Sequence, residues 1–193
     1  VEERRQGYGA AYRAGFRRAT GDYLVAMDGD GTYPGGAIAG LLDAAIDGEL
    51  DFISGDRTGR GGSRTAPAGG LSHGLRALGN RLLSGAQRAL FGVPVRDSQS
   101  GMWVLRRAIL PLLRLTADGM AFSEEIKIEA FTHPRLRARE LPIDYCPRTG
   151  HSKLRVWRDG VQNLLFLLRK RLAQQSRAVG RAALGQPREE QSD

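Results

Sequence analysis

The order of apolar and polar residues divides the first part of the chain into alternating helices and strands. Residues 8–19 are predicted to form a helix that ends at the turn residues 20–22. Residues 23–27 form a short apolar run that stops at acidic residues, a pattern typical of a buried parallel strand. Apolar residues then recur at a spacing that predicts a helix with one buried face: Ile38, Leu41, Leu42, Ala45 and Ile46. A second strand at residues 51–54 completes an order that predicts an α/β sheet.

The second half continues this alternation after a long loop. Residues 55–70 are rich in Gly and Arg and too long for a simple connection, which leaves a functional loop and a disordered loop as alternatives. Ser123 is expected to cap the N-terminus of a helix that carries Glu124 and Glu125 in its first turn. The apolar spacing predicts a helix over 71–90, a strand over 102–105, the helix from Ser123 to about Phe131, a strand over 137–145 and an amphipathic helix over 155–184.

The composition fits a globular chain with a strong excess of basic residues. The 193 residues include 29 Lys+Arg against 21 Asp+Glu, a net charge of +8, and the 41% of hydrophobic residues argues against a disordered chain. This charge favours phosphate-bearing partners such as nucleotides, nucleic acids or lipid headgroups. The single cysteine, Cys146, excludes an internal disulfide, and no apolar run reaches the length of a membrane span. We therefore expect a protein of the cytoplasm.

Two carboxylates one residue apart follow the first predicted strand. Asp28 and Asp30 come at its carboxyl end, where open α/β sheets bind ligands. Such a pair suits Mg²⁺ or Mn²⁺, which bind substrate phosphates at the same time. An EF-hand is excluded, because Tyr33 stands where its sixth residue must be glycine and Ala39 where its twelfth must be glutamate. The pair by itself leaves a divalent-cation site and a simple turn as alternatives.

The acidic pair belongs to an ordered set of motifs. The set consists of residues 7–10, 20–34, 55–57, 97–102, 119–125, 140–145, 148–154 and 159–160. In order and spacing these segments resemble the family 2 glycosyltransferases of the GT-A fold, and more narrowly the branch of polyprenyl-phosphate (dolichol-phosphate) mannosyltransferases. The resemblance covers residues 7–160 and implies a Rossmann-like, mostly parallel sheet flanked by helices.

The resemblance also implies roles for single residues. Asp28 and Asp30 match the D-x-D pair that holds a metal ion on the diphosphate of the sugar nucleotide. Asp97 matches the acceptor-side turn, and Glu125 matches an acidic residue before the next helix; we predict both as catalytic residues. The residues implied to bind the sugar and the phosphates are Arg57, Ser100, Gly101, Arg148, Ser152 and Lys153.

The chemistry of sugar transfer agrees with these roles. Departure of the nucleoside diphosphate develops negative charge, which a metal at the D-x-D pair would neutralise together with Arg148 and Lys153. A lipid-phosphate acceptor is already largely ionised near neutral pH, so it needs a cation such as Arg57 to position it. A hydroxyl acceptor would instead need a general base, for which Asp97 and Glu125 are the candidates.

The resemblance divides the chain into three parts. Residues 1–160 correspond to the catalytic domain, 161–185 to a basic amphipathic helix and 186–193 to a polar, disordered tail. Family members begin with a strand, a helix and a second strand that build the nucleotide-base pocket, so the catalytic domain is expected to be incomplete at its N-terminus. The helix carries five basic residues and no acidic one, which predicts peripheral contact with the inner face of the cell membrane. A helix packed on the catalytic domain is the alternative.

These observations predict an inverting, metal-dependent glycosyltransferase. It would move a hexose, mannose by the resemblance, from a sugar nucleotide such as GDP-mannose to polyprenyl phosphate. A non-catalytic sugar-nucleotide-binding module is the alternative, motivated by the incomplete N-terminal unit. A nucleic-acid-binding protein is a distant alternative that rests on charge, and we expect no nucleic-acid partner, because the sequence holds no recognisable helix-turn-helix and no basic strand with interleaved aromatic residues.

Overall fold

The computed structural model of the protein describes residues 4–58, 71–146 and 156–184. The predicted helices and strands all form, within a few residues of the expected bounds. Arg148, Ser152, Lys153 and most of the predicted Gly- and Arg-rich loop lie outside the described residues. The elements in chain order are α1 (Tyr8–Arg18), β1 (Tyr23–Ala26), α2 (Ala37–Asp47), β2 (Phe52–Asp56), α3 (Leu71–Phe91), β3 (Trp103–Arg106), the 3-10 helix η1 (Arg107–Leu112), α4 (Phe122–Thr132), β4 (Ala138–Pro142) and α5 (Val156–Leu184).

The four strands of the described residues form one mixed sheet with the order β1-β3-β2-β4. β4 pairs with β2 in parallel, whereas β3 lies between β1 and β2 and is antiparallel to both. β1, β2 and β4 therefore run in one direction. Because β3 runs the other way between β1 and β2, two of the three described ladders are antiparallel, whereas the sequence predicted mostly parallel pairing. The reason is that the turn at residues 97–101 lies at the edge where β1 and β2 end, so the strand that follows it must run back. Apolar periodicity carries no information on strand direction.

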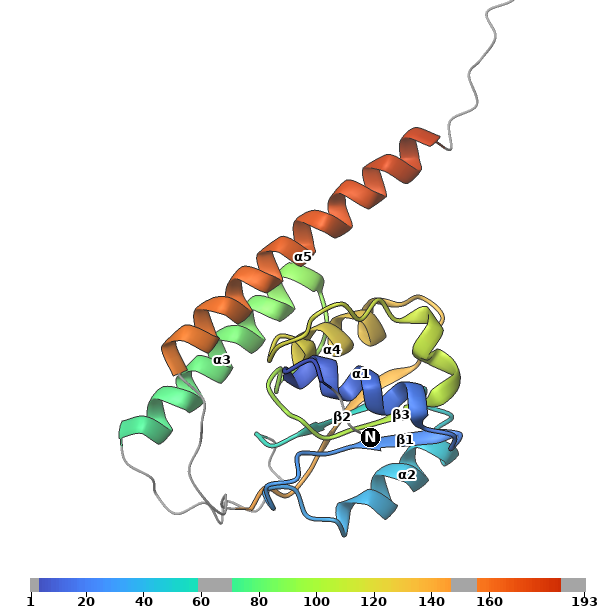
Figure 1. The fold of residues 1–193 in the computed structure, drawn as a ribbon, viewed down its shortest axis with the longest axis vertical. Helices are drawn as coiled ribbons and strands as arrows, with labels where there is room; N and C mark the ends of the chain where they lie inside the picture. Colours follow the sequence, from blue (N-terminus) through green and yellow to red (C-terminus); the bar gives the residue numbers. More distant parts are fainter. Residues whose placement is uncertain (1–3, 59–70, 147–155, 185–193) are drawn as a thin grey trace, which may run out of the picture.

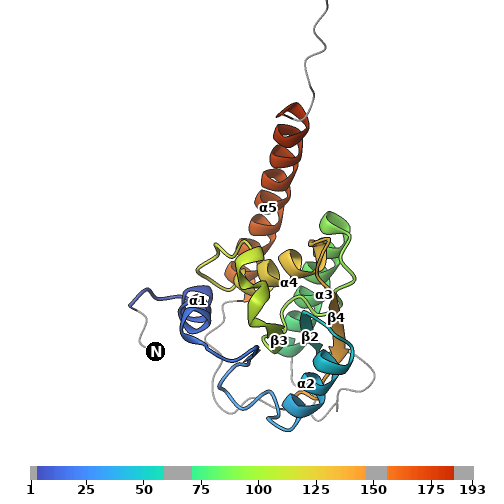
Figure 2. The same ribbon diagram turned by 90° about the vertical axis from the view of Figure 1, so that its right-hand side faces the viewer.

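Both faces of the sheet are covered, because successive strand residues point to opposite sides. On one face, Phe52, Trp103 and Leu105 pack with the apolar sides of α1 and α4. On the other face, Ile53 and Val104 pack against α2. Figure 2 shows the sheet between these helices. Trp103 is completely buried in this core.

A further layer covers the outer side of α4. α3 and α5 lie side by side, and Leu83 of α3, Ile128 of α4 and Leu167 of α5 form a third apolar cluster (Figure 1). α4 is thus buried on two sides, and α5 continues beyond the α/β body in both views (Figures 1 and 2). Among the described helices, none combines the length and the apolar character that crossing a bilayer requires.

β1 is an edge strand of the described sheet, because β3 is its one partner there. Next to it, a cavity of about 470 Å³ lies between α1 and β1, lined among others by Tyr12, Phe16 and Leu24. Val25 and Met27 at this edge are 39% and 36% exposed. The edge therefore presents apolar side chains together with open backbone groups.

Candidate functional site

The ends of β1 and β2 and the turn before β3 meet at one edge of the sheet. Asp28, two residues after the end of β1, is half-buried, and its Oδ1 accepts hydrogen bonds from the hydroxyls of Tyr8 (3.2 Å) and Tyr12 (3.5 Å). Burial raises the pKa of the Tyr8 hydroxyl well above its usual value, so it remains a donor. Gly101 lies against the same carboxylate: a Cβ atom at this position would come within 2.7 Å of Asp28 Oδ2. The close approach of the turn to Asp28 therefore requires glycine.

Asp30 is oriented by the residues that follow it. Its Oδ1 accepts hydrogen bonds from the backbone N–H of Thr32 (3.1 Å) and from the Thr32 hydroxyl (2.6 Å). Within the part of the chain that the structure describes, no group of three or more His, Cys, Asp or Glu side chains is arranged to hold a metal ion. Two carboxylates nevertheless fit a hard divalent cation, which takes its remaining ligands from water and substrate phosphates. The donor set of Asp28 and Asp30 is thus compatible with Mg²⁺ or Mn²⁺.

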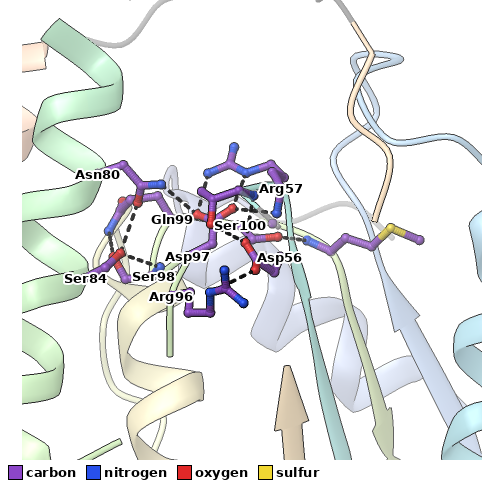
Figure 3. Close-up of polar contacts among 12 residues, drawn as sticks. Asp56, Arg57, Asn80, Ser84, Arg96, Asp97, Ser98, Gln99 and Ser100 are labelled. Carbon is purple, nitrogen blue, oxygen red and sulfur yellow. Dashed lines mark hydrogen bonds and ion pairs between the residues drawn. The ribbon is translucent and has the colours of Figure 1, made fainter. Parts of the chain in front are cut away.

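The structure brings Arg57 and Asp97 together in a bidentate ion pair (Figure 3). Arg57 Nε lies 2.7 Å from Asp97 Oδ2 and Nη2 lies 2.8 Å from Oδ1, while the Arg57 backbone N–H donates to the same carboxylate (3.1 Å). Burial by itself would raise the pKa of Asp97, but Arg57 outweighs it and holds this pKa well below its usual range. The guanidinium also lies 5.1 Å from the ring centroid of Tyr145. Both partners of the pair are therefore charged at neutral pH.

Neighbouring elements fix the backbone around Asp97. Asn80 of α3 donates to Asp97 Oδ1 at 2.9 Å, and Ser84, one turn further, accepts from the Ser98 N–H at 2.9 Å (Figure 3). Glu140 of β4 accepts from the backbone N–H groups of Asp97 (3.0 Å) and Arg96 (2.7 Å). A carboxylate with this many donors and a low pKa is a weak base. The arrangement therefore favours Asp97 as the residue that orients Arg57 over the predicted role as a general base.

A buried lysine also binds the backbone of this turn. Lys127 of α4 is fully buried, and its Nζ donates to the backbone oxygens of Asp97 (2.9 Å), Ser98 (2.8 Å) and Ser100 (2.8 Å). Burial lowers the pKa of Lys127 to about 7. None of the sequence motifs pointed to this residue. The available signal was a lysine in the middle of an apolar helix, in a chain whose basic residues are nearly all arginines.

Ser123 does not cap α4 as predicted, because the helix begins at Phe122 and Ser123 therefore lies inside its first turn. Ala121 occupies the N-cap position without a side-chain hydrogen bond. The Ser123 hydroxyl instead lies 3.1 Å from the carbonyl oxygen of Ser98 and 3.0 Å from that of Ser100. The first turn of α4 thus supports the turn before β3 rather than its own N-terminus.

Glu124 is buried and forms part of a chain of polar side chains that reaches α5. Its Oε1 accepts from Gln99 Nε2 (2.7 Å), and Gln99 Oε1 accepts from Asn163 Nδ2 (3.1 Å). Among the described residues, Glu124 Oε2 has no hydrogen-bond partner. Burial raises the pKa of Glu124 to about 8, so this carboxyl group is mostly protonated at neutral pH.

Glu125, the second predicted catalytic residue, makes different contacts. Its Oε2 accepts from the backbone N–H groups of Thr116 and Ala117 (2.8 Å each), and its Oε1 lies 3.0 Å from Nζ of Lys170 on α5. Its hydrogen bonds and ion pair thus go to the loop before α4 and to α5, not to Asp28 or Arg57. The structure brings together Asp28, Arg57, Asp97, Ser100 and Gly101 around one turn, while Glu125 joins the loop to α5.

Ser100 and Gly101 complete this turn. The carbonyl oxygen of Ser100 also accepts from the indole Nε1 of Trp103 (2.9 Å), and the backbone N–H of Gly101 donates to the hydroxyl of Tyr33 (2.7 Å). The site therefore consists of a rigid turn, residues 97–101, with an arginine bound at one end and the Asp28 carboxylate against the other.

Comparison with known proteins identifies the family. Residues 1–112 match the model of glycosyl transferase family 2. The chain belongs to this family. It is 32% identical over 168 residues to the low-salt glycan biosynthesis hexosyltransferase Agl6 of Haloferax volcanii, covering 87% of this chain and 40% of that protein.

Two further relatives of this family 2 chain have names that refer to lipid phosphates. It is 32% identical over 157 residues to the dolichyl-phosphate hexose transferase of Haloferax volcanii (80% of this chain, 63% of the relative). It is 31% identical over 156 residues to the polyprenol monophosphomannose synthase of Mycolicibacterium smegmatis (77% and 56%). The chain thus spans between 40% and 63% of the length of these three relatives.

Solved structures confirm the GT-A fold. Glucosyl-3-phosphoglycerate synthase of Mycobacterium tuberculosis, in complex with Mn²⁺, uridine-diphosphate-glucose and phosphoglyceric acid, superimposes with a TM-score of 0.60 at 22% identity, covering 86% of this chain and 56% of the other. Its complex with Mn²⁺, uridine diphosphate and phosphoglyceric acid gives a TM-score of 0.61 at 20% identity, with 86% and 54% covered. At this identity the likeness concerns the fold.

Proposed function

We propose that this family 2 chain transfers a hexose from a sugar nucleotide to polyprenyl phosphate with inversion of configuration. The observation that carries the proposal is the turn at residues 97–101, which binds Arg57 through Asp97 and contacts Asp28 through Gly101. The names of two relatives, a dolichyl-phosphate hexose transferase and a polyprenol monophosphomannose synthase, support the lipid-phosphate acceptor. Mannose, with GDP-mannose as donor, is the hexose that we propose.

The donor would bind at the Asp28 side of the turn. Asp28 and Asp30 would hold Mg²⁺ or Mn²⁺, and a bound divalent ion would neutralise the negative charge of the departing diphosphate. Tyr8 and Tyr12 orient the Asp28 carboxylate, and Thr32 orients that of Asp30. The support for a divalent ion is the pair of hard oxygen donors and the Mn²⁺ in complexes of the solved relative.

The acceptor would bind at the Arg57 side. Asp97 keeps the guanidinium charged and in a fixed orientation, so that Arg57 can position an acceptor phosphate. An ionised phosphate oxygen attacks the anomeric carbon without a strong general base. We propose that Ser100 and Gly101 shape this side, and that Arg148, Ser152 and Lys153 close over the phosphates.

The acceptor lipid determines where such a reaction takes place. Polyprenyl phosphate lies in a membrane, so we propose that the protein works from the cytoplasm at the inner face of the cell membrane. The proposed division of labour assigns sugar transfer to residues 1–160 and membrane contact to the helix at 161–185, with 186–193 as a tail.

The test is transfer of labelled sugar from GDP-mannose to a short-chain polyprenyl phosphate with Mn²⁺ or Mg²⁺, with UDP-glucose as the competing donor. We expect Asp30→Asn and Gly101→Ala to reduce transfer at least about tenfold, the second because its Cβ would displace the Asp28 carboxylate. Asp43→Asn, an exposed carboxylate on α2, and Gly35→Ala, where a Cβ meets no atom within 4 Å, are the matched controls.

Two outcomes would contradict the proposal. Full transfer by Asp30→Asn would remove the metal role of the acidic pair. Metal-dependent binding of the sugar nucleotide without any transfer would favour a non-catalytic binding module.

A further inference from the structure

Tyr33 connects the loop that carries the acidic pair, residues 28–33, to the turn at residues 97–101. We call this loop the acidic loop. The Tyr33 side chain is 4% exposed, and its hydroxyl accepts a hydrogen bond of 2.7 Å from the backbone N–H of Gly101. Burial raises the pKa of this hydroxyl to about 12, so it stays neutral at pH 7. Because Gly101 also lies against the Asp28 carboxylate, residues at both ends of the acidic loop contact the same glycine.

Thr32 connects the acidic loop to the segment that follows β4. Its N–H and hydroxyl donate to Asp30 Oδ1, and its carbonyl oxygen accepts from the backbone N–H of Cys146 at 2.8 Å. The Thr32 side chain is fully buried. The position of Asp30 is therefore tied to the backbone directly after Tyr145.

The ring of Tyr145 contacts both Tyr33 and Arg57. The two tyrosine rings meet edge to face, with centroids 5.4 Å apart and planes at 74°. The Arg57 guanidinium carbon lies 5.1 Å from the Tyr145 centroid, a distance at which a cation and an aromatic ring attract each other. Asp97 binds the same guanidinium through Nε and Nη2. Arg57 is thus held by a carboxylate and by a ring that itself packs against Tyr33.

Two routes of contact therefore lead from the acidic loop to Arg57, in addition to the direct contact of the first aspartate with the turn. One runs from the Tyr33 hydroxyl to Gly101 and along the turn to Asp97. The other runs from the Tyr33 ring to Tyr145 and on to the guanidinium. Protein interiors are close-packed, so a displacement of Tyr33 would be passed on along both routes.

We propose that Tyr33 and Tyr145 are positioning residues that couple the cation-binding loop to the phosphate-binding arginine. Two carboxylates one residue apart repel each other, and a bound cation removes this repulsion and fixes the loop that carries them. The fixed loop would hold Tyr33, and through it Tyr145 and the turn, in the arrangement that orients Arg57. Because coupling between two sites is reciprocal, a phosphate at Arg57 would strengthen cation binding by the same factor. The coupling rests on the proposed function, which assigns the acidic pair to the donor and Arg57 to the acceptor.

The experiment measures binding of a short-chain polyprenyl phosphate by isothermal titration calorimetry, with and without saturating Mn²⁺. We expect Mn²⁺ to increase the affinity of the wild type about tenfold. In Tyr33→Phe, which retains the ring but loses the hydroxyl that accepts from Gly101, this increase should fall to about threefold or less. The affinity of this variant without Mn²⁺ should match that of the wild type, because a linking residue acts when both ligands are present.

Tyr145 is tested with two variants and a matched control. Tyr145→Leu should weaken phosphate binding roughly threefold and lower the effect of Mn²⁺, because the ring beside the guanidinium is lost. Tyr145→Phe retains the ring and should restore both wild-type values. The control is Tyr23→Phe at the opposite end of β1. The Tyr23 hydroxyl accepts from Arg106 Nε at 3.2 Å and its ring lies 5.7 Å from that guanidinium, so the pair is similar but lies away from the site.

Three results would overturn the coupling: a wild type whose phosphate affinity does not respond to Mn²⁺, an unchanged Mn²⁺ effect in Tyr33→Phe, or an equal loss of the effect in Tyr23→Phe. Circular dichroism checks that the variants remain folded. Inorganic phosphate is the second probe of the Arg57 side, so the coupling can be measured without the lipid.

Transfer of labelled sugar, measured in parallel, separates the coupling from the proposed function. A wild type that couples the two ligands without transferring sugar contradicts only the proposed function. A wild type that transfers sugar without coupling the two ligands contradicts only the role of the two tyrosines.

Discussion

A single buried lysine supports the turn on which both halves of the site depend. Lys127 contacts three backbone carbonyl oxygens within residues 97–100, and this turn orients Arg57 at one end and touches Asp28 at the other. Carbonyl oxygens that are buried without a donor destabilise a protein, and so does a buried ammonium group without acceptors. The hydrogen bonds between Lys127 and the turn therefore satisfy the polar groups of both.

Replacing this lysine should therefore destabilise the whole protein. We expect Lys127→Met to lower the free energy of unfolding by roughly 2–4 kcal/mol, because an apolar side chain removes the charged donor shared by three buried carbonyl groups. The carbonyls of Ser98 and Ser100 would keep the neutral donors Ser123 and Trp103. Ser123→Ala, which removes a neutral hydroxyl shared between the carbonyls of Ser98 and Ser100, should cost about 1 kcal/mol. Urea unfolding measures both values; equal stability of Lys127→Met and wild type would contradict the supporting role.

Glu124 makes the stability depend on pH. Its pKa in the folded protein, about 8, lies above the ordinary value of 4.5, so the folded state binds more protons than the unfolded state between these values. Stability is therefore highest below the ordinary pKa and falls as the pH rises. Between about pH 5 and 7 this group alone accounts for a loss of up to about 2–3 kcal/mol. Above this window the lowered pKa of Lys127 acts in the opposite direction.

The variant Glu124→Gln, which resembles the protonated side chain, should remove this part of the pH dependence. We expect it to be more stable than the wild type at pH 7 and nearly equal to it at pH 5. Thermal unfolding at both pH values gives the comparison, and parallel curves for the two proteins would show that Glu124 is ionised in the fold.

At the scale of the elements, α5 packs on α3 and α4 through one side and leaves the other apolar side open. Leu167 is fully buried beside Leu83 and Ile128, whereas Leu164, three residues earlier, is 42% exposed. Replacing either leucine by alanine changes the helix propensity of α5 in the same way. The difference in stability between the two variants therefore measures the contribution of packing.

We expect Leu167→Ala to lower the free energy of unfolding by about 2–5 kcal/mol, through lost burial and a cavity in the third apolar cluster. Leu164→Ala should change it by no more than about 0.5 kcal/mol. Urea unfolding of the two variants tests whether α5 unfolds together with the sheet, and a second, separate transition for α5 in the wild type would contradict this.

Local pattern predicted the elements well, and tertiary contacts explain where it failed. The strand at residues 51–54 and the helix over 71–90 follow from residue spacing alone, and the motifs placed Arg57 and Asp97 in one site. The direction of β3 depends on where its preceding turn lies, which no local pattern records. The ion-pair partner of Glu125, Lys170, and the carbonyl partners of Lys127 lie tens of residues away in the sequence, so these roles could not be predicted from helical position.

At the scale of the whole molecule, the described sheet has an apolar edge at β1. Val25 and Met27 are partly exposed there, beside the cavity between α1 and β1. An edge strand with free backbone groups and apolar side chains tends to pair with other chains.

We expect this chain to self-associate at raised concentration and Val25→Lys to reduce the association at least about threefold, because a lysine on an edge strand disfavours strand pairing. Ile46→Lys, an equal change on the outer side of α2, is the control for net charge. Sedimentation velocity measures the association, and equal behaviour of the two variants would assign it to charge rather than to the edge.

Trp103 makes the turn at residues 97–101 accessible to fluorescence spectroscopy. Its indole is fully buried, and its N–H donates to the carbonyl of Ser100, next to the glycine that contacts Asp28. The chain has two tryptophans, so replacing Trp157 by phenylalanine leaves one emitter beneath the site. Binding of a cation or a nucleotide at the turn can then be followed by intrinsic emission, without a labelled substrate and without turnover.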